Sequence, residues 1–161
     1  MPDLTGKIHR LSHYRGRIVI VNFWSAECPW AERADRDLVS YLPKWGARVA
    51  LLTVAANVNE SDEPCAEASR TRSLPLVLRA SSEVLEVYGV QVTPHLFVID
   101  ADGVLRYRGA FDDVSFRQRE PTCFFLKDAV DDLLAGRLPE IQESAPYGCT
   151  IVRFMLKSNR D

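Results

Sequence analysis

The sequence predicts an α/β fold, with a central mixed β-sheet flanked by helices and a C-terminal extension after it. Two apolar, β-prone runs at 18–24 and 49–54 enclose a segment with helical spacing. Two further β-prone runs are separated by Asp102-Gly103, and an amphipathic helical pattern follows them. The chain has 161 residues, of which 47% are hydrophobic and 26% charged, so it can form one domain with a real core.

The first half predicts a β-α-β unit. The run 18–24 is nearly all apolar, as in a strand covered on both faces. Residues 29–45 are expected to form a helix, with Pro29 in the first turn and Pro43 kinking or ending it. Its apolar positions recur at helical spacing: Ala31, Ala34, Leu38, Tyr41, Leu42 and Trp45. The run 49–54 is then a second buried strand, parallel to the first.

The middle of the chain is less regular. Residues 57–73 are polar and are expected to form a loop with a short helix, and 74–78 a short strand. A second short helix is expected over 82–88, ended by Gly89, which suits the left-handed closing position.

The last third predicts a hairpin and a helix. Strands at 95–100 and 104–108 are joined by the tight Asp-Gly turn. Residues 124–135 form an amphipathic helix closed by Gly136. We therefore assign 1–138 to one domain, including the N-terminal segment 1–17, and 139–161 to an extension that contains a short alternating apolar stretch at 151–156.

Composition excludes several classes of function. A net charge of −2 gives no reason to expect nucleic acid or an anionic membrane as partner. No apolar window is long enough to span a membrane, and the N-terminus lacks the apolar core of a signal peptide, so we expect a cytoplasmic protein, with a mature extracytoplasmic form left open. The four cysteines are far apart and lack a metal-type pairing such as C-x-x-C, which predicts neither a zinc site nor a dense disulfide scaffold. We expect no cofactor and no bound metal.

Two sequence blocks resemble a known family. The first is 5–28, with Val21-Asn22-Phe23-Trp24-Ser25 and Cys28; the second is 88–103, with Val92-Thr93-Pro94-His95. Both resemble the TlpA-like branch of the thioredoxin-like superfamily, within the redoxin (AhpC-TSA related) group. The element Tyr147-Gly148-Cys149-Thr150-Ile151 is similar to a Gly-Cys-x-Ile element of some bacterial redoxin-domain proteins. The resemblance implies a thioredoxin-like fold and thiol-disulfide chemistry.

Cys28 is the candidate nucleophile. A thiol in the first turn of a helix faces unpaired backbone N–H groups and the positive end of the helix dipole. Both favour the thiolate, so we expect a pKa below the free value of about 8.5, although Glu27 opposes the shift. The chemistry also requires this sulfur to be open to solvent.

The usual second cysteine is missing. The position three residues after Cys28 is Ala31, so a C-x-x-C disulfide cannot form. The resemblance assigns the attacking role to Cys28, the neighbouring aromatic to Trp24 and a cis-proline to Pro94, with the backbone of Thr93 presented to an extended substrate. The buried acid of thioredoxins is replaced by Asn22.

Three uses of one attacking thiol remain open. An external thiol, such as glutathione or a partner protein, could resolve the mixed disulfide. A distant cysteine could do so instead, with Cys149 preferred to Cys65 and Cys123 taken as structural. Cys28 could also react with peroxide, as in a peroxiredoxin, although only the hydroxyl of Ser25 fits that pattern.

Three residues are candidates for substrate binding. Trp30 and Pro29 at the helix start could form an exposed apolar platform, and His95 is either a base near Cys28 or a half-buried histidine. The expected partners are protein or low-molecular-weight thiols and disulfides, with peroxide as a further candidate; the oligomeric state is open. The competing hypothesis is a redox-inactive binding module that docks an extended chain beside Pro94.

Overall fold

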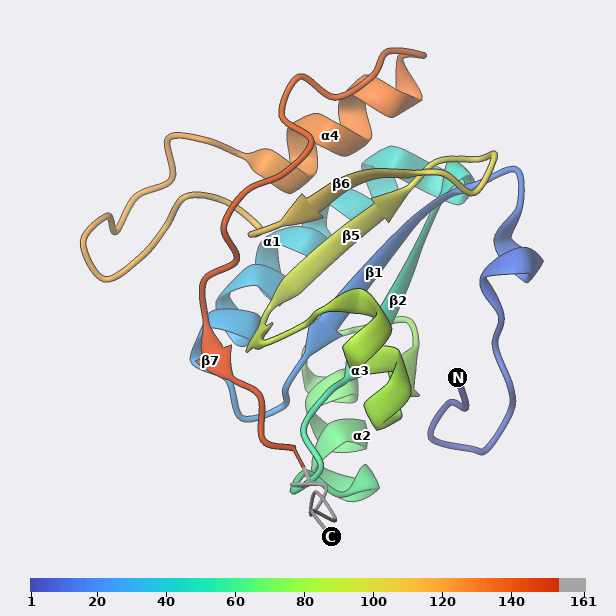
Figure 1. Ribbon diagram of the computed structural model, residues 1–161, viewed down its shortest axis with the longest axis vertical. Coiled ribbons are helices and arrows are strands. Elements are labelled where there is room, and N and C mark those ends of the chain that lie inside the picture. Colours follow the sequence, from blue (N-terminus) through green and yellow to red (C-terminus); the bar gives the residue numbers. More distant parts are fainter. Residues whose placement is uncertain (154–161) are drawn as a thin grey trace, which may run out of the picture.

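A five-stranded mixed sheet lies at the centre of the computed structural model, which describes residues 1–153 (Figure 1). The strand order is β3-β2-β1-β5-β6. Its strands are β1 (Ile18–Trp24), β2 (Val49–Ala55), β3 (Val77–Arg79), β5 (His95–Ile99) and β6 (Leu105–Gly109). The first three strands are parallel, whereas β5 is antiparallel to β1 and to β6.

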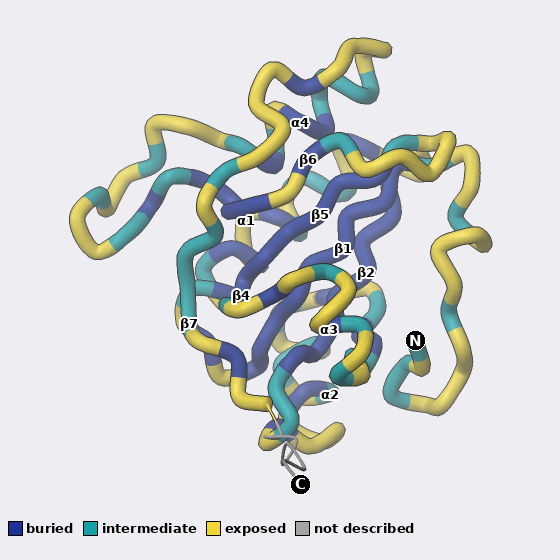
Figure 2. Tube along the Cα trace, viewed as in Figure 1, coloured by how far each residue is buried: buried dark blue, intermediate teal, exposed yellow. Residues whose placement is uncertain are grey.

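Strand β1 is the middle of this sheet. All seven of its residues are buried, and it pairs with β2 from Ile18 to Trp24 and with β5 from Val19 to Phe23. This confirms the prediction of a strand covered on both faces (Figure 2).

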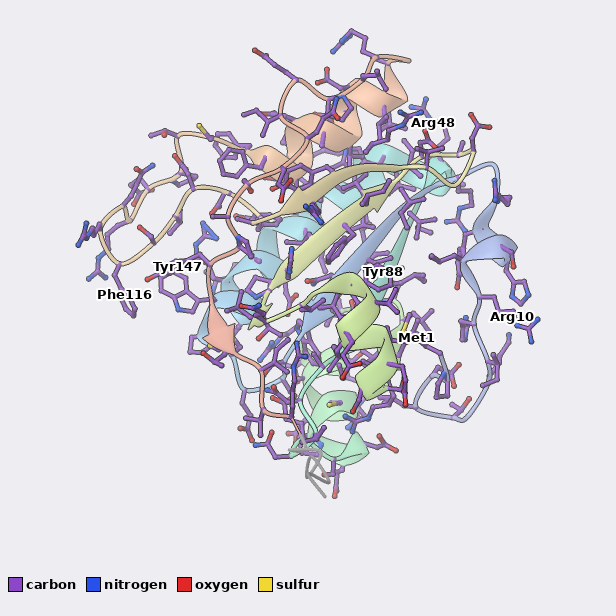
Figure 3. All side chains as sticks on the ribbon, in the orientation of Figure 1. Met1, Arg10, Arg48, Tyr88, Phe116 and Tyr147 are labelled. Atoms are coloured by element: carbon purple, nitrogen blue, oxygen red, sulfur yellow. The ribbon has the colours of Figure 1, made fainter. Side chains whose placement is uncertain are left out.

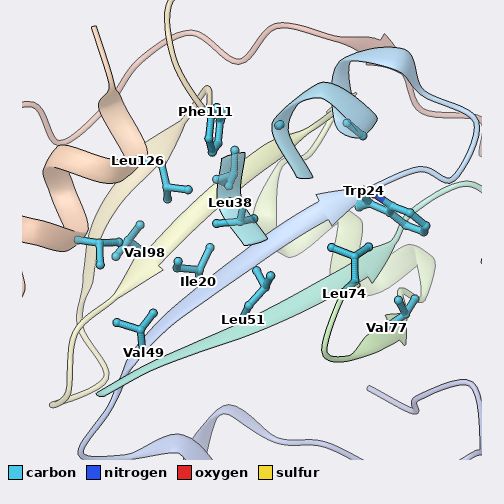
Figure 4. Packing of buried hydrophobic residues seen from close by; sticks show 14 of the residues in the cluster. Ile20, Trp24, Leu38, Val49, Leu51, Leu74, Val77, Val98, Phe111 and Leu126 are labelled. Carbon is cyan, nitrogen blue, oxygen red and sulfur yellow. The ribbon is translucent and has the colours of Figure 1, made fainter. Parts of the chain in front are cut away.

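Helices cover both faces of the sheet. They are α1 (Pro29–Trp45), α2 (Asp62–Thr71), α3 (Ser82–Tyr88) and α4 (Phe125–Leu134), with short 3-10 turns at Leu11–Tyr14 and Gly46–Arg48. Leu38 of α1 and Leu126 of α4 pack with Ile20 on one face (Figure 4). Leu85 of α3 packs with Phe97 on the other face. None of the helices in residues 1–153 has the length and hydropathy of a membrane span.

The structure confirms the helix predicted at 29–45 and the short helix expected within 57–73, and it corrects the strand predicted at 74–78. Helix α1 continues past Pro43 to Trp45, whose buried indole donates a hydrogen bond to Asp131 at 2.8 Å and holds the last turn in place. Strand β3 begins at Val77 rather than at 74, because Pro75 has no N–H for pairing. The polar segment 57–73 contains the ten-residue helix α2. Its one buried residue is Cys65, and a single buried position gives no apolar periodicity from which the helix bounds could be predicted.

A second, two-stranded sheet was not predicted. It pairs β4 (Val92–Thr93) with β7 (Cys149–Thr150) in antiparallel fashion. Part of the alternating stretch at 151–156 lies outside the described residues.

The extension reaches β4 by running along β6. Arg108 donates its N–H to Gln142 O and accepts from Ser144 N, both at 3.1 Å. The Ser144 hydroxyl also lies 2.7 Å from the Tyr107 hydroxyl. Gly109 lies against Ser144 and has a φ of +147°, so a side chain at this position would overlap Ser144. The extension is therefore attached to the sheet before it reaches β7.

Leu38 offers a direct test of the packing of α1. It is fully buried against the sheet, so Leu38→Ala leaves a cavity and should lower the free energy of unfolding by about 2–5 kcal/mol. Urea denaturation followed by circular dichroism measures this loss. Arg36→Ala, on the exposed side of the same helix, should change it by less than about 0.5 kcal/mol, and equal losses in both variants would contradict the packing described.

Candidate functional site

Cys28 lies at the start of α1, immediately after the turn that follows β1. It is the N-cap residue, and its carbonyl accepts from Glu32 N at 3.0 Å. Its own N–H donates to Ser25 O at 3.4 Å. The residue is only 1% exposed, so the expectation of a sulfur open to solvent is wrong for this conformation.

The Cys28 thiol faces the loop that contains Pro94. The Thr93-Pro94 peptide bond is cis, which confirms the geometry expected of this proline. The Cys28 Sγ donates to Thr93 O at 3.1 Å. The two sequence blocks that carry the family resemblance therefore meet at this contact.

Cys149 is the second sulfur of the site. Strand β7 places Cys149 opposite Thr93, the residue whose carbonyl accepts from Cys28 Sγ, so the two cysteines lie on either side of this residue. Both cysteines are free thiols. Burial raises the pKa of Cys149 to about 12, and the Cys28 thiol adds to the shift, whereas the backbone N–H of Trp30 opposes it. The cysteine missing from α1 is thus replaced in space by one from the extension.

An aromatic cluster of Trp30, Phe116 and Tyr147 borders the two sulfurs. The Trp30 ring centroid lies 5.3 Å from that of Phe116 and 4.9 Å from that of Tyr147, with nearly perpendicular ring planes. The Tyr147 hydroxyl accepts from Phe116 N at 3.2 Å. Figure 3 shows Phe116 on its loop beside Tyr147. Trp30 is consequently half-buried rather than exposed, and Phe116, 73% exposed, carries the open side of the cluster.

A buried carboxylate holds the turn before Cys28. Glu60, 3% exposed, accepts from the Ser25 hydroxyl and from Ala26 N at 2.9 Å. It also accepts from the Asn57 side chain at 3.0 Å. Since these donors come from the turn and from the loop after β2, Glu60 fixes the path of the backbone into α1.

A second polar group lies below the turn. Asp35 is fully buried and accepts from Trp24 Nε1 at 2.7 Å and from Arg72 at 3.1 Å. Arg72 also donates to Ala26 O at 2.6 Å, and its guanidinium carbon lies 5.4 Å from the centre of the Trp24 ring. Burial raises the pKa of Asp35 to about 6, because desolvation outweighs these hydrogen bonds. Trp24 therefore acts as part of the support beneath the turn.

The other candidate residues lie elsewhere. His95 packs on Phe97, with ring centroids 4.5 Å apart, on the opposite face of the sheet from Cys28. Burial lowers the pKa of His95 to about 4, so it is neutral at pH 7. Cys65 is buried in α2 next to Glu60, where burial raises its pKa to about 11, and Cys123 is exposed before α4. No group of three or more potential metal ligands occurs within residues 1–153.

Sequence reasoning missed four residues of the site: Asp35, Glu60, Arg72 and Gly148. The three charged residues lie on polar stretches that are indistinguishable from solvated surface. Gly148 belongs to the short Gly-Cys-x-Ile element, but no residue near it in the sequence indicates that it packs against Thr93 and Pro94.

The sequence of this chain is similar to those of known proteins. The profile of the AhpC/TSA family matches residues 1–108. The thiol-disulfide oxidoreductase ResA of Geobacillus thermodenitrificans is 32% identical over 111 residues, and that of Geobacillus kaustophilus 35% over 112 residues. Each alignment covers 66% of this chain and 62% of the relative, so the chain spans less than two thirds of the length of these relatives.

Solved structures confirm the thioredoxin-like fold. A hypothetical protein of Sinorhizobium meliloti 1021 superposes with a TM-score of 0.83 at 25% identity, covering 94% of this chain and 88% of that one. A conserved protein of Geobacillus kaustophilus gives 0.82 at 23% identity, covering 95% and 87%. The thioredoxin domain of a thiol-disulfide oxidoreductase from Bacteroides vulgatus gives 0.57 at 24% identity, covering 65% and 77%.

The raised pKa of Asp35 predicts a pH dependence. The folded protein binds this proton more tightly than the unfolded chain, so the contribution of Asp35 to stability falls as pH rises from about 4 to about 6. The free energy of unfolding of Asp35→Asn relative to the wild type should therefore rise by about 2–3 kcal/mol between pH 4 and pH 7. Urea titrations at several pH values measure this difference. Asp37→Asn, exposed on the same helix, should keep the wild-type pH profile, and a parallel profile for Asp35→Asn would contradict the assignment.

The role of Glu60 predicts a graded loss of stability. Glu60→Ala leaves the Ala26 N–H and the Asn57 amide without an acceptor and should lower the free energy of unfolding by about 3 kcal/mol. Glu60→Gln keeps one carbonyl acceptor and should lose less. Thermal and urea unfolding measure both variants; a Glu60→Ala protein as stable as the wild type would show that the turn does not depend on this carboxylate.

Proposed function

Because this chain belongs to the AhpC/TSA family and has a thioredoxin-like fold, we propose that it is a thiol-disulfide oxidoreductase with Cys28 as attacking and Cys149 as resolving thiol. The observation that carries the proposal is the position of Cys149 opposite Thr93, whose carbonyl accepts from Cys28 Sγ at 3.1 Å. Cys149 provides the second sulfur, which helix α1 lacks because the position three residues after Cys28 is Ala31.

The reaction has two exchange steps. The Cys28 thiolate attacks one sulfur of a substrate disulfide, the substrate S–S bond breaks, and one substrate thiolate leaves and takes up a proton from solvent. The Cys149 thiolate then attacks the Cys28 sulfur, the mixed disulfide breaks, and the second substrate thiolate leaves. Two electrons pass to the substrate, and an external dithiol must reduce the Cys28–Cys149 disulfide for the next turnover.

The surrounding backbone supports both sulfurs. Cys28 lies at the positive end of α1, where unpaired N–H groups favour a thiolate. The Trp30 N–H belongs to the same first turn, and it opposes the rise in the pKa of Cys149. Deprotonation of Cys28 requires its thiol to give up the bond to Thr93 O.

The substrates are proposed as protein or low-molecular-weight disulfides. The curated relatives are named thiol-disulfide oxidoreductases, and this activity supports the same chemical class here. The peroxidase hypothesis is less well supported, because the Ser25 hydroxyl donates to Glu60 rather than to the reactive sulfur. Loss of peroxide in a Cys28-dependent manner, at a rate above disulfide exchange, would favour it instead.

Disulfide mapping tests the proposal. Treatment of the reduced protein with a small disulfide, followed by mass spectrometry, should yield a Cys28–Cys149 bond in the wild type and a stable Cys28 mixed disulfide in Cys149→Ser. Cys65→Ser and Cys123→Ser should behave as the wild type, since neither residue pairs with Cys28. Oxidation that leaves Cys149 free in the wild type would refute internal resolution, and a Cys28 that never reacts would leave only a binding module.

A further inference from the structure

The extension occupies the edge of β4, the strand that contains Thr93, the contact of the Cys28 sulfur. Strand β7 pairs with β4 through Val92–Thr150 and Thr93–Cys149, and Ile151 N donates to Gln91 O at 3.0 Å. Cys28, whose Sγ donates to Thr93 O, is 1% exposed. A substrate sulfur that is to reach Cys28 along this edge must occupy the place where Cys149 now lies.

Gly148 makes the approach of β7 to this edge possible. A Cβ built at residue 148 would overlap the carbonyl oxygen of Thr93 and lie 3.1 Å from Pro94 Cδ. Any other residue would push the strand away from the cis-proline loop. The position before the cysteine in a docked segment must therefore be glycine.

The flanking positions of the segment are also selected. Two residues before the cysteine, Tyr147 packs against Trp30 in the aromatic cluster. Two residues after it, Ile151 is 7% exposed and belongs to the core cluster that contains Phe23. Thr150, between Cys149 and Ile151, is exposed, so this position is not selected by packing. The edge thus accepts an extended chain of the pattern aromatic-Gly-Cys-x-aliphatic.

We propose that the β4 edge is a docking site used in turn by β7 and by an extended substrate segment with this same pattern. The inference rests on the proposed function and adds to it the class of substrate and the means of its release. In the resting protein β7 occupies the edge. It leaves when a substrate segment docks, and its return brings Cys149 to the mixed disulfide.

Resolution of the Cys28–substrate disulfide and release of the reduced substrate segment then occur in the same step. As β7 pairs again with Val92 and Thr93, the Cys149 thiolate attacks the Cys28 sulfur and the bond from Cys28 to the substrate sulfur breaks. The substrate thiolate takes up a proton from solvent, and its segment has lost both its covalent bond and its place on β4. No further oxidant or reductant enters this step.

The reactivity of Cys28 tests the competition without requiring turnover. Gly148→Val prevents β7 from pairing, so iodoacetamide should alkylate Cys28 at least tenfold faster than in the wild type, as followed by mass spectrometry. Ala145→Val adds similar bulk in the exposed part of the same extension and should leave the rate unchanged. Thermal unfolding checks that both variants are folded. An unchanged rate in folded Gly148→Val would overturn the proposal.

A model substrate tests the pattern. The peptide Tyr-Gly-Cys-Thr-Ile, with its cysteine as a mixed disulfide with thionitrobenzoate, releases a coloured thiolate when Cys28 attacks. In Cys149→Ser it should react at least tenfold faster than the matched peptide Tyr-Val-Cys-Thr-Ile. Equal rates would overturn the specificity, whereas no release from either peptide would instead refute the proposed function of Cys28.

The lifetime of the mixed disulfide tests the coupling. In Gly148→Val the Cys28–peptide disulfide should form faster than in the wild type but persist at least tenfold longer, although Cys149 is still present. Rapid resolution in this variant would show that Cys149 is delivered without strand pairing, and would overturn the exchange mechanism.

Discussion

The central position of β1 is the constraint on which the site depends. Because β1 pairs in parallel with β2 and antiparallel with β5, the end of β1 and the start of β5 meet at the same edge of the sheet. Helix α1 starts at this edge with Cys28, and β5 starts there just after Pro94. The contact between Cys28 Sγ and Thr93 O follows from this sheet topology, and Glu60 and Arg72 hold the turn that leads from β1 to Cys28.

Placing the second sulfur on a strand rather than on the same helix changes the character of the redox pair. In a C-x-x-C helix the two sulfurs are neighbours by local geometry, whatever the rest of the fold does. Here their proximity depends on β4–β7 pairing, on Gly148 and on the aromatic cluster. The position of Cys149 beside Cys28 therefore depends on the docked extension, so the proposed redox chemistry would depend on the conformation of the chain.

The parts of the fold that follow from short-range signals could be predicted from the sequence. The bounds of β1 and α3 follow from an uninterrupted apolar run and from Gly89 at a left-handed closing position. The burial of Cys28, the pairing of β7 and the role of Glu60 could not be predicted, because each depends on segments far apart in the chain. The sequence context made Cys149 a candidate, but its proximity to Cys28 is seen only in the folded chain.

Ser144 gives the extension a fixed point beside the sheet. Its hydroxyl contacts the Tyr107 hydroxyl and accepts from Ala110 N at 3.0 Å, and its N–H donates to Arg108 O. From this anchor five residues lead to Cys149, a tether of at most about 17 Å. In the proposed mechanism, an undocked Cys149 would stay at an effective concentration on the order of millimolar or above near Cys28, so it would compete as an intramolecular nucleophile against dissolved thiols.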